Sequence, residues 1–261
     1  MCRRLACLVS LVMVLGLIGA DEVLGRTFDI RIATGEDDVE QHLGNGDIDL
    51  TSTDLELAYE DDGTPATDAQ IIGLRFVDIP IGRGTQILSA YVEFEVDSVG
   101  KAASADPVNL VVEGELTPDA PAFLDATDNI TDRPSWTSAN VKWSVPAWTA
   151  TNIKWQTPDI SAVIQEIVKK PGCASGNALV LIFSDDADDP STGLREAESF
   201  DGEALAAPLL HMEVFSVIAM EPDPADGATA VTMPLLQWTP GDSAVLHEVY
   251  FVTNPSMGPD V

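Results

Sequence analysis

Along most of the chain apolar residues alternate with polar ones, a pattern typical of β-strands with one face in a core and one in water. In residues 90–96, for example, Val92, Phe94 and Val96 share one face. Similar alternation predicts strands at residues 72–76, 108–112 and 210–214. The run 178–183 is apolar on both faces and predicts a central strand. Short strands separated by Gly, Pro and Asp turns predict an all-β protein, a jelly-roll β-sandwich.

One segment follows a helical period instead. Between residues 158 and 169 the apolar positions recur three and four residues apart, at Ile160, Val163, Ile164, Ile167 and Val168. Thr157 is the expected N-terminal cap, Pro158 suits a first turn, and Pro171 follows the end. We therefore predict a single short helix that packs on a sheet.

The composition changes after residue 217, where the chain becomes rich in Pro, Asp, Ala and Gly. This change predicts a linker over residues 218–228. Residues 229–261 then resemble the opening strands of a fibronectin type III-like domain, with Trp238 early and Tyr250 on a later strand. Such a domain needs about 100 residues, so we expect this second Ig- or fibronectin-like β module to be incomplete. A natural short tail is the alternative.

The first twenty residues have the pattern of a signal peptide. Arg3 and Arg4 precede the apolar run 5–18, and small residues follow it. We expect residues 1–20 to be cleaved and the protein to be secreted, either free or at the cell surface. The run is shorter than the ~20 residues of a membrane-spanning helix, so no membrane insertion is expected after cleavage. A retained anchor is the alternative.

The charge of the chain narrows the choice of partners. It has 43 Asp and Glu against 13 Lys and Arg, a formal net charge of -30. This charge repels phosphate backbones and anionic lipids, so nucleic acid is excluded as a partner. Cations and uncharged polymers remain.

Six segments, taken in chain order, form a recognisable series: GLRFVDIP, ILSAYVEFEV, WQTPDISAVIQEIV, GNALVLIF, GLREAESFDG and APLLHMEV. The series resembles the secreted bacterial DNRLRE domains and related carbohydrate-binding modules over about residues 28–217, and we assign the sandwich module to residues 26–217. The resemblance implies a jelly-roll accessory module attached to larger surface or polysaccharide-degrading proteins. An acidic opening and a Trp-rich insertion depart from the family pattern, so the ligand does not carry over.

The acidic opening of the module is the candidate metal site. Its carboxylates include Asp37, Asp38, Glu40, Asp54 and Glu56. Calcium takes six to eight oxygen ligands, several of them from carboxylates. The resemblance implies a structural calcium near the first strand, with Asp38 and Glu40 as the main ligands and Asp37 and Asp201 as further candidates. A solvated acidic face is the alternative.

The candidate ligand-binding residues are aromatic. Four of the five tryptophans lie within twenty residues: Trp136, Trp143, Trp148 and Trp155. Indole rings stack on the apolar faces of sugars. We expect Trp148 to be the most exposed member of such a platform. The alternative is that Trp143 and Trp155, in the similar strings VKW and IKW, cover the edge of the core.

These observations favour a secreted, non-catalytic accessory module that binds polysaccharide. The histidines are too far apart in sequence for a zinc site, and no pattern places a carboxyl group in an apolar pocket beside an ionised partner, as a glycosidase requires. On charge alone, neutral glycans are favoured over uronates unless calcium bridges them. Two alternatives stay open: a structural or adhesive cell-surface spacer, and an appendage of a hydrolase whose catalytic domain lies outside this chain.

Overall fold

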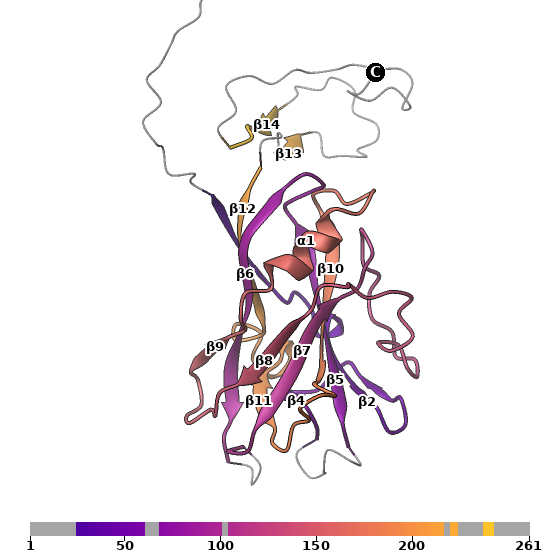
Figure 1. Ribbon diagram of the computed structural model, residues 1–261, viewed down its shortest axis with the longest axis vertical. Helices are drawn as coiled ribbons and strands as arrows, with labels where there is room; N and C mark the ends of the chain where they lie inside the picture. Colours follow the sequence, from indigo (N-terminus) through magenta and orange to yellow (C-terminus); the bar gives the residue numbers. More distant parts are fainter. Residues whose placement is uncertain (1–24, 61–67, 101–103, 217–219, 224–236, 243–261) are drawn as a thin grey trace, which may run out of the picture.

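Two antiparallel sheets pack face to face in the computed structural model and form a β-sandwich (Figure 1). The structure describes residues 25–60, 68–100, 104–216, 220–223 and 237–242. The predicted β-sandwich is therefore confirmed, and its jelly-roll connectivity stays a prediction. The signal-peptide prediction for residues 1–20 lies outside the described residues.

The first sheet has the strand order β1-β12-β6-β11-β4, with β9 also paired to β6. Its strands are β1 (Arg26–Arg31), β4 (Asp54–Leu57), β6 (Gln86–Ser98), β9 (Lys154–Gln156), β11 (Arg195–Glu198) and β12 (Leu209–Phe215). The short strand β4 lies at one edge of this order, a position that matters for the candidate site.

The second sheet has the order β3-β2-β5-β10-β7-β8. Its strands are β2 (Asp38–His42), β3 (Ile48–Asp49), β5 (Gln70–Ile79), β7 (Val108–Gly114), β8 (Val141–Val145) and β10 (Asn177–Asp185). A 3-10 turn, η1 (Gly35–Asp37), precedes β2. The strand predicted as central, β10, lies between β5 and β7.

The main core lies between the two sheets and follows the predicted alternation. Val92, Phe94 and Val96 of β6 are each 0% exposed, and the ring of Phe94 meets that of Phe183 edge-on. Because alternate side chains of a strand point to opposite faces, Glu93 and Glu95 are left on the outer face of the first sheet.

The predicted helix is confirmed as α1 (Ser161–Val168), which covers one end of the core. Its expected cap is wrong. Thr157 precedes the helix by four residues and accepts a hydrogen bond at Oγ1 from the backbone N–H of Val92, 3.1 Å away. Asp159 accepts the N–H of Ser161 instead. A second helix, α2 (Phe200–Glu203), was not predicted.

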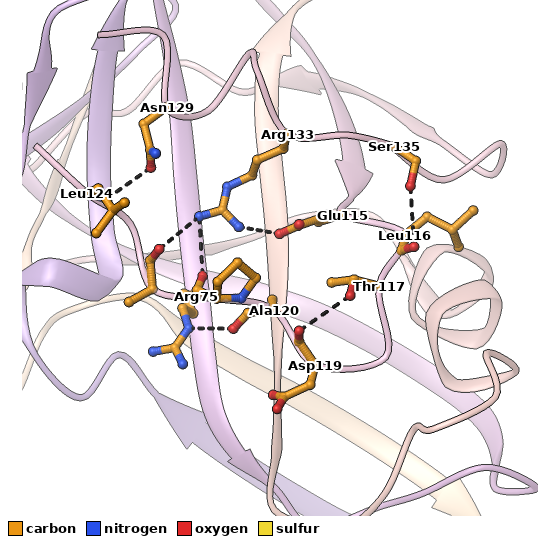
Figure 2. A network of polar contacts seen from close by, with 12 residues as sticks. Arg75, Glu115, Leu116, Thr117, Asp119, Ala120, Leu124, Asn129, Arg133 and Ser135 are labelled. Atoms are coloured by element: carbon orange, nitrogen blue, oxygen red, sulfur yellow. Dashed lines mark hydrogen bonds and ion pairs between the residues drawn. The ribbon is translucent and has the colours of Figure 1, made fainter. Parts of the chain in front are cut away.

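A long segment between β7 and β8 covers the outer face of the second sheet. Phe123 and Ile130 of this segment form a second apolar cluster with Val180 and Ile182 of β10. Figure 2 shows Arg133 of the same segment bonded to Glu115, and its guanidinium lies 4.3 Å from the ring centroid of Phe123. The covering segment explains why β10 is apolar on both faces.

A small two-stranded sheet follows the sandwich. It pairs β13 (Met220–Asp223) with β14 (Gln237–Thr239). Strand β13 lies inside the segment predicted as a linker, residues 218–228. Within 229–261 only residues 237–242 are described, so the fibronectin-like module stays a prediction.

Candidate functional site

Two pairs of acidic residues face each other across β4 and β11. The register of these antiparallel strands places Glu56 opposite Glu196 and Asp54 opposite Glu198. Their neighbours Leu55, Leu57 and Ala197 enter the main core, so all four carboxylates lie on the outer face of the sheet. Like charges directly opposite each other destabilise a sheet. A bound cation or a proton would reduce the repulsion between these carboxylates.

Three of the four residues form a compact group. Asp54, Glu56 and Glu196 each offer one carboxylate oxygen, and these oxygens all lie within 4.8 Å of one another. The side chains are largely shielded, since Glu56 is 5% exposed and Glu196 1% exposed. This acidic triad can hold a metal ion. Asp54 and Glu56 belong to the acidic opening that the sequence marks as a candidate metal site, whereas Glu196 lies outside that segment.

The electrostatics of the triad agree with its burial. The pKa of Glu56 rises to about 8, mainly because the carboxyl group is buried and then because Asp54 and Glu60 lie nearby. The pKa of Glu198 rises to about 7, through burial and the charges of Asp97 and Glu95. A bound cation would compete with the protons that these carboxyl groups retain.

Buried polar side chains from the second sheet adjoin the triad. Gln70 is 1% exposed, and its Nε2 donates to Glu60 at 2.6 Å and to Glu56 at 3.4 Å. Its carbonyl oxygen Oε1 is buried and accepts no hydrogen bond from the described residues. Glu40 accepts the backbone N–H of Glu56 at 2.7 Å. A buried acceptor without a donor, beside carboxylates, is an environment that a cation would satisfy.

An open polar cleft lies next to the triad. Its volume is about 640 Å³, and Asp54 and Glu196 form part of its wall. The rest of the wall comes mainly from Thr53, Asp97, Ser98, Asn152, Glu198 and Glu203. The triad is thus reachable from solvent on one side although two of its members are nearly fully buried.

Helix α2 closes one side of this cleft. Ser199 caps the helix by accepting the N–H of Gly202 at 3.1 Å, and its hydroxyl donates to the carbonyl of Ser52 at 2.7 Å. A Cβ atom at Gly202 would lie 2.0 Å from the carbonyl oxygen of Thr53. Only glycine therefore permits this close approach of α2 to the segment before β4.

The residues predicted as calcium ligands separate into two places. Asp37 pairs with Arg75 at 2.8 Å, and Asp38 accepts the backbone N–H of Phe200 at 2.8 Å. Burial raises the pKa of Asp38 to about 7, and the nearby charge of Asp201 adds to the rise. Glu40 lies instead beside Glu56. These four residues do not form a group whose ligand atoms all lie within 4.8 Å, as the triad does.

The tryptophans do not form the expected exposed platform. Trp148 is 4% exposed, so the expectation that it is the most exposed of the four is wrong. Trp143 is also 4% exposed and stacks on Phe94 in the core, and Trp155 packs against the same core at intermediate exposure. Trp136 packs against the second apolar cluster. The alternative interpretation, that the indoles cover the core, describes Trp143 and Trp155.

The chain matches no protein-family model and no curated protein sequence. The resemblance to DNRLRE domains therefore stays a prediction. Within the described part of the chain, no helix is both long enough and apolar enough to cross a membrane.

Proposed function

We propose that this chain is a non-catalytic accessory module of an exported protein, a jelly-roll β-sandwich that binds calcium between β4 and β11 and presents the adjoining cleft to an extracellular polysaccharide. The observation that carries the proposal is the buried triad of Asp54, Glu56 and Glu196, formed by acidic residues on adjacent strands. Because Asp54 and Glu196 line the open cleft, a cation bound to the triad would lie beside the surface that we propose contacts the polysaccharide.

The donor set favours calcium over other metals. All three side chains are carboxylates, which are hard oxygen donors, and the group includes no histidine or cysteine of the kind that zinc prefers. Calcium accepts irregular sets of six to eight oxygens, whereas magnesium demands a near-ideal octahedron and keeps several waters. Water from the cleft would complete the coordination.

The spacing of one acidic pair beside the triad argues against glycoside hydrolysis by that pair. Glu198 and Asp97 share a side-chain hydrogen bond, so their carboxyl groups are in contact. Retaining and inverting glycosidases hold their two carboxyl groups about 5 Å or more apart, on either side of the bond that breaks. Glu198 and Asp97 are therefore not spaced as the acid and base of a glycosidase are.

A calcium titration of the intact chain tests the cation site. Isothermal titration calorimetry should give saturable binding that is lost in Glu196→Gln, which keeps the shape of the side chain and removes its charge. Asp125→Asn is the matched control, because Asp125 is exposed and far along the chain from the triad. The absence of any saturable calcium binding to the wild type would refute the proposal.

The polysaccharide part of the proposal is tested at the cleft rather than at the cation. Asn152 is exposed, lines the cleft and has a φ of 58°, so Asn152→Gly removes its side chain while glycine tolerates the same backbone conformation. Affinity electrophoresis in neutral glucan and in alginate, with calcium and with chelator, should show calcium-dependent retardation that this variant weakens. Neutral glycan is expected to be the better ligand, because the acidic cleft repels uronates.

A structural or adhesive spacer at the cell surface is the second candidate. The burial of Trp143 and Trp148 favours it, because it removes two of the four aromatic residues expected to contact sugar. Unchanged electrophoretic mobility in every glycan, together with intact calcium binding, would make the spacer the better assignment. An appendage of a hydrolase is compatible with either role.

A further inference from the structure

The short strand pair β13–β14 is connected to one end of the sandwich through specific contacts. Arg26 begins β1, and Ser216 directly follows β12. The register of the first sheet pairs Arg26 with Val214, so the two attachment points lie on adjacent strands at the same end of the sheet. Both meet Asp242, three residues after β14.

The carboxylate of Asp242 bridges these two strands. Its Oδ1 lies 2.8 Å from Nε of Arg26, and its Oδ2 accepts the backbone N–H of Ser216 at 2.8 Å. The backbone N–H of Asp242 donates in return to the carbonyl of Ser216, and Arg26 donates to the carbonyl of Pro240. Arg26 and Ser216 are thus each held by two hydrogen bonds.

The two contacts of the Asp242 carboxylate are partly buried, whereas the hydrogen bond from Arg26 to Pro240 is exposed. The side chain of Asp242 is 10% exposed and that of Arg26 25% exposed, and Gly241 between Pro240 and Asp242 is buried. An exposed ion pair contributes little because water and salt screen it. A shielded carboxylate that accepts from both a guanidinium and a backbone N–H forms stronger, charge-assisted hydrogen bonds with a defined direction.

We propose that Asp242 forms a rigid joint that fixes the β13–β14 unit to the sandwich, so that the two move as one body. The partner of this surface is the next unit of the same chain. The segment expected to be a linker contains β13. The joint restricts motion between the β13–β14 pair and strands β1 and β12. The β13–β14 unit would then keep a fixed angle to the sandwich, whichever ligand the sandwich binds.

Nuclear magnetic resonance on the full chain tests the joint. ¹⁵N relaxation of amides in 220–223 and 237–242 should give the same rotational correlation time as amides of the sandwich. In Asp242→Asn the two sets should separate, and exchange of the Ser216 amide should accelerate about 10-fold or more, as expected when a charge-assisted hydrogen bond is lost. Asp125→Asn, a charge removal at an exposed site, should change neither quantity.

Arg26→Gln provides a second variant, in case Asp242→Asn unfolds the strand pair. It leaves the β13–β14 sequence intact and should also separate the correlation times, with the unfolding temperature of the sandwich as a check on folding. Different correlation times in the wild type would overturn the proposal. Unchanged relaxation and unchanged Ser216 exchange in both variants would overturn it as well.

Discussion

Glu56 and Glu196 lie directly opposite each other on β4 and β11, with 5% and 1% of their surfaces exposed. Two carboxylates in this relationship repel each other strongly when both are ionised, because little water separates or screens them. The cost falls when a proton or a cation is shared between them.

Calcium should therefore stabilise the folded chain. A ligand present at 100 times its dissociation constant adds about 2.7 kcal/mol to the free energy of unfolding. We expect the thermal unfolding midpoint to rise with calcium, to fall with excess chelator, and to respond less to magnesium. In Glu196→Gln the midpoint should no longer depend on calcium. A wild-type midpoint that is the same in calcium and in chelator contradicts a structural calcium site.

Asp38 should make stability depend on pH. Its pKa is raised from 3.8 to about 7, first by burial and then by the charge of Asp201, against the lowering effect of the Phe200 N–H. The folded chain thus holds a proton that the unfolded chain loses. The stabilisation due to this proton is fully present below about pH 4, declines as pH rises to about 7, and is absent above.

Asp38→Asn removes this titration and keeps an acceptor for the Phe200 N–H. The free energy of unfolding of the variant relative to the wild type should increase between about pH 4.5 and about pH 8, as measured by urea unfolding. Comparing the two proteins at each pH cancels the other buried carboxyl groups. A constant difference across this range is the result that would argue against a buried, protonated Asp38.

Trp148 should matter for stability more than for ligand binding. Trp148→Ala leaves a cavity in the main core and should cost about 3–5 kcal/mol of unfolding free energy. Trp148→Phe should cost clearly less, because the indole Nε1 has no hydrogen-bond partner among the described residues. Denaturant unfolding of both variants measures the difference. If Trp148→Phe lost glycan binding but kept its stability, the result would support the original hypothesis that the tryptophans bind sugar.

The buried pair of Arg133 and Glu115 should be costly to break. Glu115 is 2% exposed and Arg133 9% exposed. Arg133→Met would leave a buried carboxylate without its cation and should cost about 3–5 kcal/mol. The double variant with Glu115→Leu should recover much of this loss. Arg83→Met, at an exposed position, is the control for removing an arginine and should change the unfolding midpoint little.

Local pattern was enough to predict much of the sandwich. The alternation at 90–96 placed Val92, Phe94 and Val96 in the core, and the two-sided apolar run at 178–183 became the central strand β10. Both features depend only on which side of one strand a residue faces. Such information is present in the sequence because the side-chain period of a strand is two.

The candidate site depended on information of a different kind. Glu196 meets Glu56 only because β11 pairs with β4 in a particular register, and the two strands are far apart in sequence. A shift of one residue would turn Glu196 into the core and dissolve the triad. The burial of Trp148 likewise depends on packing against core residues that are distant in the chain.

The segment between β7 and β8 covers the outer face of the second sheet, so the two outer faces of the sandwich differ. Phe123 and Ile130 seal the outer face of the second sheet, so changes on that face disturb an apolar cluster. The outer face of the first sheet carries the triad and its cleft. Substitutions made to graft a new binding site should therefore disturb the apolar clusters less on the outer face of the first sheet than on the covered face of the second sheet.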